Sequence, residues 1–146
     1  MRTIRKAETA DKGFWFGLDR HLPEDEFERK VRDGQAYVIL SDGAPAGLMR
    51  YGLFWDEIPF CNMLVIAPEH RGQGMGKALM SAWETEMAAQ GYDLLMVSTQ
   101  SDETAQHFYR KLGYRDCGVL LMDAPGREQP AELFFMKNEG TICCFF

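Results

Sequence analysis

The chain has 146 residues and a formal net charge of −6, and 46% of its residues are hydrophobic. This length corresponds to one domain with a core of its own, and the composition is typical of a folded protein and excludes a disordered one. The negative charge argues against nucleic acid, which would favour a basic surface, and mildly favours a cationic ligand such as an amine.

The N-terminus and the cysteines bear on where the protein works. The first residues lack the apolar stretch of a signal peptide, and no run approaches the length of a membrane span. The cysteines have none of the spacings typical of metal sites, so we expect free thiols and no bound metal; they are Cys61, Cys117, Cys143 and Cys144. A soluble, cytoplasmic protein without a membrane partner is expected.

In chain order, the first half of the sequence predicts a strand, two helices and three strands. The second helix has Pro23 near its start and acids in its first turn, as helix N-termini favour. Turn residues at Asp42-Gly43 separate the first two of the three later strands, and a loop over residues 55–60 precedes the third. The strands are expected at residues 2–6, 36–41, 46–54 and 62–66, and the helices at 9–20 and 23–32.

The second half predicts a long amphipathic helix over residues 77–90 that ends at Gly91. A buried strand at 94–99, a helix from 102 to about 112, and strands near 118–122 and 132–137 follow, the last two joined by a turn at 123–130. The whole order is that of an α/β chain. Residues 138–146 are ambiguous, because their aromatic end could pack on a partner or fray.

The glycine-rich segment between the strand at 62–66 and the helix at 77–90 reads Arg71-Gly72-Gln73-Gly74-Met75-Gly76-Lys77. Glycine has no Cβ, so the backbone can turn tightly and approach a ligand closely. The unpaired N–H groups of the first helical turn then point at the same place, where the helix dipole favours an anion. The pattern predicts a site for a phosphorylated ligand; the alternative is a tight strand-to-helix connection that binds nothing.

Two common phosphate-binding motifs do not fit this segment. Ala78 follows Gly76-Lys77, where a P-loop needs Ser or Thr to hold magnesium. Lys77 stands where the dinucleotide fingerprint needs Gly or Ala. The loop is therefore of another kind.

A second segment, residues 102–115, reads Asp-Glu-Thr-Ala-Gln-His-Phe-Tyr-Arg-Lys-Leu-Gly-Tyr-Arg. Asp102 is a suitable N-cap and Gly113 a suitable C-terminal stop for a helix. In order, spacing and length, the two segments together resemble the GCN5-related N-acetyltransferase (GNAT) family over nearly the whole chain. The first segment matches the family pattern at Arg71, Gly74 and Gly76, and the second at Ala105, Phe108, Tyr109, Gly113 and Tyr114.

The resemblance implies a GNAT-like fold: a mixed, mostly antiparallel sheet of about six to seven strands with helices on both faces, in one domain over residues 1–146. It also implies acetyl-CoA as the acetyl donor. Its pyrophosphate would be held by the glycine-rich segment and its pantetheine and acetyl carbonyl by the backbone of the preceding strand. The expected cofactor-binding residues are Leu64, Val65, Ile66, Arg71, Gly72, Gln73, Gly74, Met75, Gly76, Lys77, Asp102 and Tyr109.

Tyr109 is the general acid that the resemblance implies, because a phenol stays protonated at neutral pH and can give its proton to a thiolate. The alternative is a packed aromatic residue whose hydroxyl bonds to backbone. Asp102 departs from the family, which usually has Asn there. An ionised Asp caps a helix but donates no hydrogen bond, which puts the cofactor contact at this position in doubt.

The base that deprotonates the amine is expected in the loop beside Trp55, with Glu57 the first candidate and Asp56 the second. The expected function is acetyl-CoA-dependent N-acetyl transfer to a primary amine of a small molecule or peptide, by direct transfer. The alternative is a non-catalytic acyl-CoA-binding or sensing module on the same fold. The aromatic C-terminal end would suit a homodimer, which the sequence does not establish.

Overall fold

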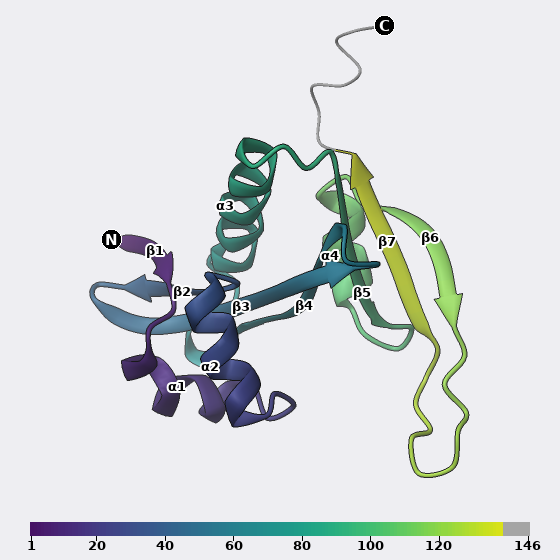
Figure 1. Cartoon of the computed structure of the whole chain (residues 1–146), viewed down its shortest axis with the longest axis horizontal. Coiled ribbons are helices and arrows are strands. Elements are labelled where there is room, and N and C mark those ends of the chain that lie inside the picture. The colour runs from purple at the N-terminus through teal and green to yellow at the C-terminus, as the bar shows by residue number, and fades with distance from the viewer. Residues whose placement is uncertain (139–146) are drawn as a thin grey trace, which may run out of the picture. The chain divides into compact units, whose positions relative to one another are not determined.

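The computed structural model describes residues 1–138, which form seven strands and four α-helices (Figure 1). The strands make one mixed sheet in the order β1-β2-β3-β4-β5-β7-β6, in which β4 and β5 run parallel and the β1–β2, β2–β3, β5–β7 and β6–β7 pairs are antiparallel. This confirms the expected fold class. Two compact units make up the chain: Met1–Gly52 with Asn62–Glu86 (unit 1), and Leu53–Cys61 with the residues from Met87 onward (unit 2).

Unit 1 contains most of the N-terminal elements and the first part of the long helix. Its strands β1 and β2 have the predicted bounds, and its third strand starts two residues earlier than predicted. The elements are β1 (Arg2–Lys6), α1 (Lys12–Leu18), α2 (Glu24–Asp33), β2 (Ala36–Ser41), most of β3 (Ala44–Phe54), the second half of β4 (Ile58–Ile66) and most of α3 (Met75–Ala89).

The strands of unit 1 are covered on both faces because their residues alternate in direction. Ala36 and Val38 of β2 belong to a core cluster with Trp15 of α1 and Phe27 of α2. Tyr37, between them in sequence, points the other way and donates a hydrogen bond from its hydroxyl to Glu86 of α3. α2 and α3 therefore lie on opposite sides of these strands (Figure 1).

A buried ion pair fixes the end of α1. The Asp19 side chain is completely buried, and one of its oxygens accepts from Nε of Arg50 at 2.7 Å and from Nε1 of Trp15 at 3.1 Å. Its other oxygen accepts from the backbone N–H of His21 at 3.2 Å. A buried carboxylate needs such partners because removal from water otherwise disfavours its charge.

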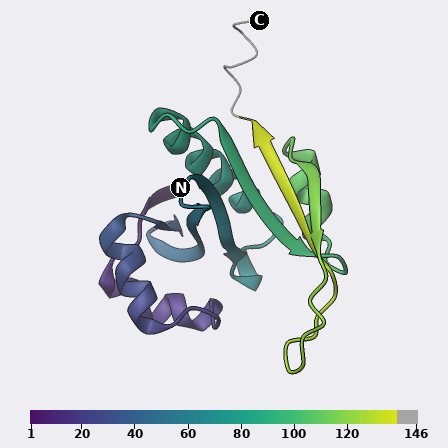
Figure 2. The ribbon, with the colours of Figure 1, turned by 45° about the vertical axis from the view of Figure 1, so that its right-hand side comes forward.

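Unit 2 contains an antiparallel β5–β7–β6 group with α4 packed against it (Figure 2). β5 (Leu94–Gln100) and β7 (Glu132–Asn138) lie close to the predicted bounds, whereas β6 (Arg115–Leu120) begins three residues earlier than predicted. β4 pairs with β5 at Phe60 and Cys61. The loop between β6 and β7 spans the predicted turn.

Several predicted boundaries are wrong by three or more residues, among them the starts of β4, α4 and β6. β4 begins at Ile58, inside the predicted loop, because Trp55 and Asp56 adopt positive φ angles of 58° and 59° and complete the turn within three residues. α4 spans Ala105–Lys111 with Thr104 at its N-cap, so Asp102 does not cap it.

No helix among residues 1–138 is long and apolar enough to cross a membrane. Most of the ambiguous C-terminal segment, including Cys143 and Cys144, lies outside the described residues.

We predict that Asp19→Ala lowers the free energy of unfolding by roughly 3–5 kcal/mol, because it leaves the buried Arg50 guanidinium without its partner. Urea denaturation monitored by tryptophan fluorescence measures this change. Asp33→Ala is the matched control: its ion pair with Arg32 is exposed, and we expect a change within about 0.5 kcal/mol. Equal effects of the two substitutions would contradict the role given to Asp19.

Candidate functional site

The glycine-rich segment of unit 1 forms an open turn between β4 and α3. Gly72 and Gly74 have φ angles of +77° and +80°, a conformation that residues with a Cβ rarely adopt. Residues 71–74 are all exposed, whereas Met75, the first residue of α3, has only 2% of its surface exposed. The turn thus exposes its backbone while the helix start is anchored in the core.

Backbone donors of the first turn of α3 are available to a ligand. The carbonyl of Gly74 accepts the first helical hydrogen bond, from the N–H of Ala78 at 3.1 Å. The N–H groups of Met75, Gly76 and Lys77 come before this bond and have no carbonyl one turn earlier within the helix. Together with the helix dipole, they make a place that favours an anion.

Three cationic side chains surround this turn. Arg71 is held in place by a hydrogen bond from its Nε to the carbonyl of Ile66, 3.0 Å away. Lys77 is exposed on the first helical turn. A Cβ built on Gly74 would lie 3.6 Å from both Nη atoms of Arg2, so this guanidinium also stands at the turn.

Sequence reasoning missed Arg2. It is the first residue of β1, and nothing in its local sequence indicates a ligand. Its place follows from the sheet, in which it pairs with Ser41 of β2. Only the fold brings it to a loop seventy residues later in the chain.

The strand residues predicted to contact the donor lie directly before the turn. Leu64, Val65 and Ile66 are half-buried in β4. A Cβ built on Gly47 of β3 would meet Cδ1 of Ile66 at 2.5 Å and the Val65 carbonyl at 3.1 Å. Glycine at position 47 therefore permits the close approach of β3 to this part of β4.

Tyr109 lies in unit 2, on α4, with only 6% of its surface exposed. Its ring contacts those of Phe108, Tyr114 and Phe135, with centroids 5.2, 6.1 and 6.2 Å away. Burial raises the pKa of its hydroxyl well above the usual value of 10, and the nearby Cys61 and Glu103 raise the pKa further. Within residues 1–138 no hydrogen bond engages this hydroxyl, so the expected alternative of a bond to backbone is not observed.

The three carboxylate residues of the predicted site are exposed. Asp56 and Glu57 stand with Trp55, itself 74% exposed, in the β3–β4 turn of unit 2. Asp102 is exposed in the turn before α4, where the side chain of Gln106 donates to the carbonyls of Ser101 and Glu103 at 2.8 and 3.0 Å. That bonding explains why the helix starts later than the sequence indicates.

Unit 1 thus brings together every predicted residue of the glycine-rich segment and adds Arg2, in an arrangement suited to a phosphorylated ligand. Among known proteins, a family model described as an acetyltransferase (GNAT) domain matches residues 32–116. The chain belongs to the GNAT family. The match includes the glycine-rich turn, α3, β5 and α4.

Solved structures of GNAT proteins share the fold. Ard1 from Thermoplasma volcanium superimposes with a TM-score of 0.82 at 16% identity, covering 94% of this chain and 97% of that one. The ribosomal-protein-S18-alanine N-acetyltransferase from Escherichia coli gives 0.75 at 20% identity, with 94% of each chain covered. A GNAT acetyltransferase from Elizabethkingia anophelis with acetyl-CoA bound gives 0.76 at 16%, covering 94% and 97%.

One curated relative is similar in sequence. Streptothricin acetyltransferase from Streptomyces lavendulae is 29% identical over 99 residues, which are 66% of this chain and 52% of that protein. The chain therefore spans about half the length of the relative that it matches.

We predict that Gly74→Val weakens coenzyme A binding tenfold or more, because a β-branched residue cannot hold φ = +80° without moving the N–H groups of α3. Isothermal titration calorimetry measures the affinity. Gly126→Val is the matched control: Gly126 has φ = +81° and open space around it, but it lies in the β6–β7 loop. Equal loss of binding in both variants would mean that backbone strain, and not the site, is responsible.

Proposed function

We propose that the protein is an acetyl-CoA-dependent N-acetyltransferase that moves an acetyl group directly to a primary amine of a small molecule or peptide. The observation that carries the proposal is the turn at Gly72 and Gly74, with free backbone donors on α3 and three cations beside it. This arrangement suits a pyrophosphate, and the family match gives the donor that bears one. A micromolar affinity for acetyl-CoA and for coenzyme A is the first result to seek by calorimetry.

Residues of unit 1 hold the donor in this proposal. The N–H groups from Gly72 to Lys77 bind its pyrophosphate, with Arg71, Lys77 and Arg2 supplying positive charge. Backbone groups of Leu64, Val65 and Ile66 bind its pantetheine and polarise the acetyl carbonyl. Once bound, the donor supplies an activated acetyl group as a thioester. Asp102 is the weakest member of the predicted set, because it neither caps α4 nor donates a hydrogen bond when ionised.

Tyr109 is proposed as the general acid that protonates the departing thiolate. Its raised pKa keeps the phenol protonated throughout the neutral and mildly alkaline range. Its hydroxyl has no hydrogen bond within residues 1–138, so its proton is not committed to a structural partner. These two properties are the ones that a proton donor needs.

Glu57, with Asp56 second, is proposed as the base that takes a proton from the amine. Both carboxylates are exposed in the turn beside Trp55, where an acceptor in solution can reach them. Because both are exposed, either can take the proton directly or through a water molecule.

The acceptor class is open between a small molecule and a peptide. Two of the similar proteins differ in the acceptor that their names give. One is a streptothricin acetyltransferase, and the other is a ribosomal-protein-S18-alanine N-acetyltransferase. A cytoplasmic location and a homodimer stay predictions. The non-catalytic alternative shares the donor site but needs no uncommitted acid, so the state of Tyr109 favours the enzyme.

We predict that Tyr109→Phe lowers kcat by about 10²-fold or more and changes the Kd of acetyl-CoA less than threefold, because only proton donation is lost. Thiol release with a panel of amines measures kcat, and calorimetry measures the Kd. The pKa of Tyr109 is raised by burial. Its contribution to the rate is therefore present at pH values below this pKa and is lost only as the pH rises through it. The wild-type rate should therefore show no decline from this group below about pH 10.

Tyr114→Phe is the matched control for this substitution. Tyr114 is buried in the same ring cluster, 6.1 Å from Tyr109 between centroids, but is not proposed to donate a proton. It should keep kcat within about threefold of the wild type. A loss of acetyl-CoA affinity in Tyr109→Phe as large as its loss of kcat would argue that Tyr109 only binds the donor.

We also predict that Glu57→Gln lowers kcat/KM for the amine by about tenfold or more at pH 7 and that the deficit shrinks at high pH, where the free amine needs no base. Asp56→Asn, its neighbour in the same exposed turn, should have the smaller effect. A pH profile of kcat/KM for both variants distinguishes them. A deficit that is constant with pH would exclude Glu57 as the base.

A further inference from the structure

One face of the unit 2 strands differs from the face that carries Tyr109. Side chains alternate along a strand, so Phe135 of β7, which contacts Tyr109, and Phe134 point in opposite directions. Glu132 is two residues from Phe134 and shares its direction. Ser98 of β5 is the register partner of Phe134 and lies on the same face. We call this surface the Phe134 face: Phe60, Ser98, Glu132 and Phe134.

The carboxylate of Glu132 is fixed on this face by neutral donors. Oε2 accepts from the hydroxyl of Ser98 at 2.7 Å, and Oε1 accepts from the amide of Gln129 at 3.0 Å. Within residues 1–138 no cationic nitrogen lies within ion-pair distance of it. The half-buried Glu86, in contrast, pairs with Lys6 at 2.7 Å. Glu132 therefore holds a half-buried negative charge in a defined orientation without a cation.

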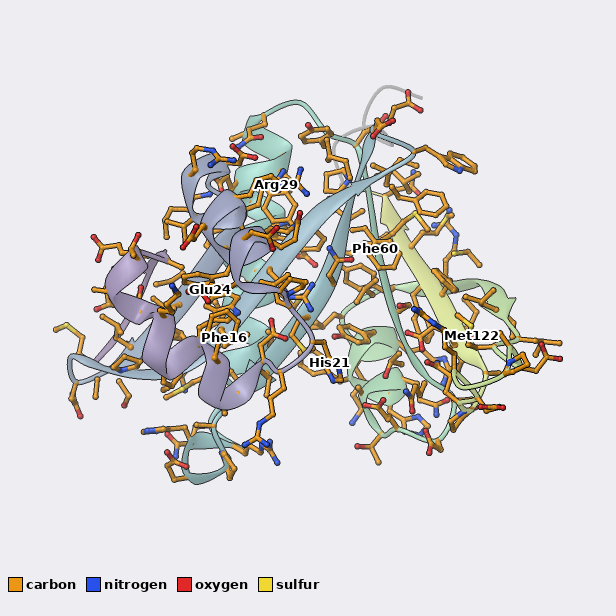
Figure 3. The ribbon with its side chains drawn as sticks, turned by 60° about the horizontal axis from the view of Figure 1, so that its bottom comes forward. Phe16, His21, Glu24, Arg29, Phe60 and Met122 are labelled. Carbon is orange, nitrogen blue, oxygen red and sulfur yellow. The ribbon has the colours of Figure 1, made fainter. Side chains whose placement is uncertain are left out.

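Aromatic rings lie on the same face of the strands as this carboxylate. The ring of Phe134 contacts that of Phe60 with centroids 5.8 Å apart. Figure 3 labels Phe60. Phe60 also contacts Phe54, at 6.1 Å, and Phe54 contacts the exposed Trp55, at 4.7 Å. The faces of aromatic rings attract cations, and their apolar area suits the alkyl part of an organic cation.

We infer that Glu132, with Phe60 and Phe134, forms a subsite for an alkylammonium or guanidinium group of the acceptor. This inference rests on the proposed function, because the cation and the amine that is acetylated are two groups of the same acceptor molecule. The ring contacts from Phe134 through Phe60 and Phe54 lead to the turn of the proposed base Glu57, so the cation held at Glu132 is not the nitrogen that this base deprotonates. The acceptor therefore carries a positive charge apart from its reacting amine, as a diamine or polyamine does.

Binding to the protein loaded with coenzyme A tests the subsite without any reaction. The probes are 1,5-diaminopentane and its neutral analogue 1,5-pentanediol, followed by ligand-observed NMR. We expect the diamine to bind at least about tenfold more tightly than the diol, and Glu132→Gln to remove this preference, because a hydrogen bond to a charged group is lost. Gln at 132 keeps an oxygen that accepts from Ser98, so the fold is preserved.

Two further variants sharpen the test. Glu128→Gln removes an exposed acid of the neighbouring loop and should leave the preference unchanged. Phe134→Leu should reduce diamine affinity severalfold while Glu132 remains. A wild type that binds both probes equally, or a preference that survives Glu132→Gln, would overturn the subsite.

Turnover with acetyl-CoA separates this inference from the proposed function. If the wild type acetylates 1,5-diaminopentane, its kcat/KM should exceed that for 5-amino-1-pentanol by about tenfold, and Glu132→Gln should make the two alike. Failure to acetylate any amine, with acetyl-CoA binding intact, contradicts the proposed function and leaves the NMR result to decide the subsite. Acetylation with no difference between the two acceptors overturns the subsite alone.

Discussion

The site depends on α3 being fixed along its length while its first turn stays open. Met75, Leu79 and Met80 are buried, and the ring of Trp83 contacts that of Tyr51 at 5.8 Å. Glu86 adds bonds to Lys6 and Tyr37. These contacts hold the helix against the strands, so its unpaired N–H groups stay in one place. Preorganised donors of this kind bind an anion without the entropy cost of being ordered on binding.

The glycine turn and the arginines are complementary parts of this arrangement. A turn with two residues at positive φ exposes N–H groups, but it gives them no net charge. Arg71, tied to the carbonyl of Ile66, and Arg2, placed by its strand, supply that charge from two elements distant in sequence. In a chain with a net charge of −6, the positive charge gathered at this turn opposes the general balance. A polyanion approaching the protein therefore finds its favourable contacts here.

The strand and helix order followed from the sequence because hydrophobic periodicity and glycine stops are local signals, as at Gly91 and Gly113, both with positive φ. Two of the boundary errors have local causes that residue type does not reveal. Trp55 and Asp56 adopt the left-handed conformation without being glycine, and the side chain of Gln106 stabilises a turn where Asp102 indicated a helix start. Arg2 and Glu132 could not be predicted, since their surroundings depend on sheet register and not on neighbours in sequence.

The alternation of side chains in β7 gives one strand two chemical environments. On the side of Phe135, Tyr109 is enclosed by rings, and its pKa rises because the charged form would lose water. On the side of Phe134, Glu132 remains partly open and keeps its oxygens on Ser98 and Gln129. Desolvation suits an acid that must stay neutral, whereas partial exposure leaves a carboxylate accessible to a ligand. One strand can thus contribute to both environments, because side chains that point to opposite faces of the sheet are not exposed to water to the same extent.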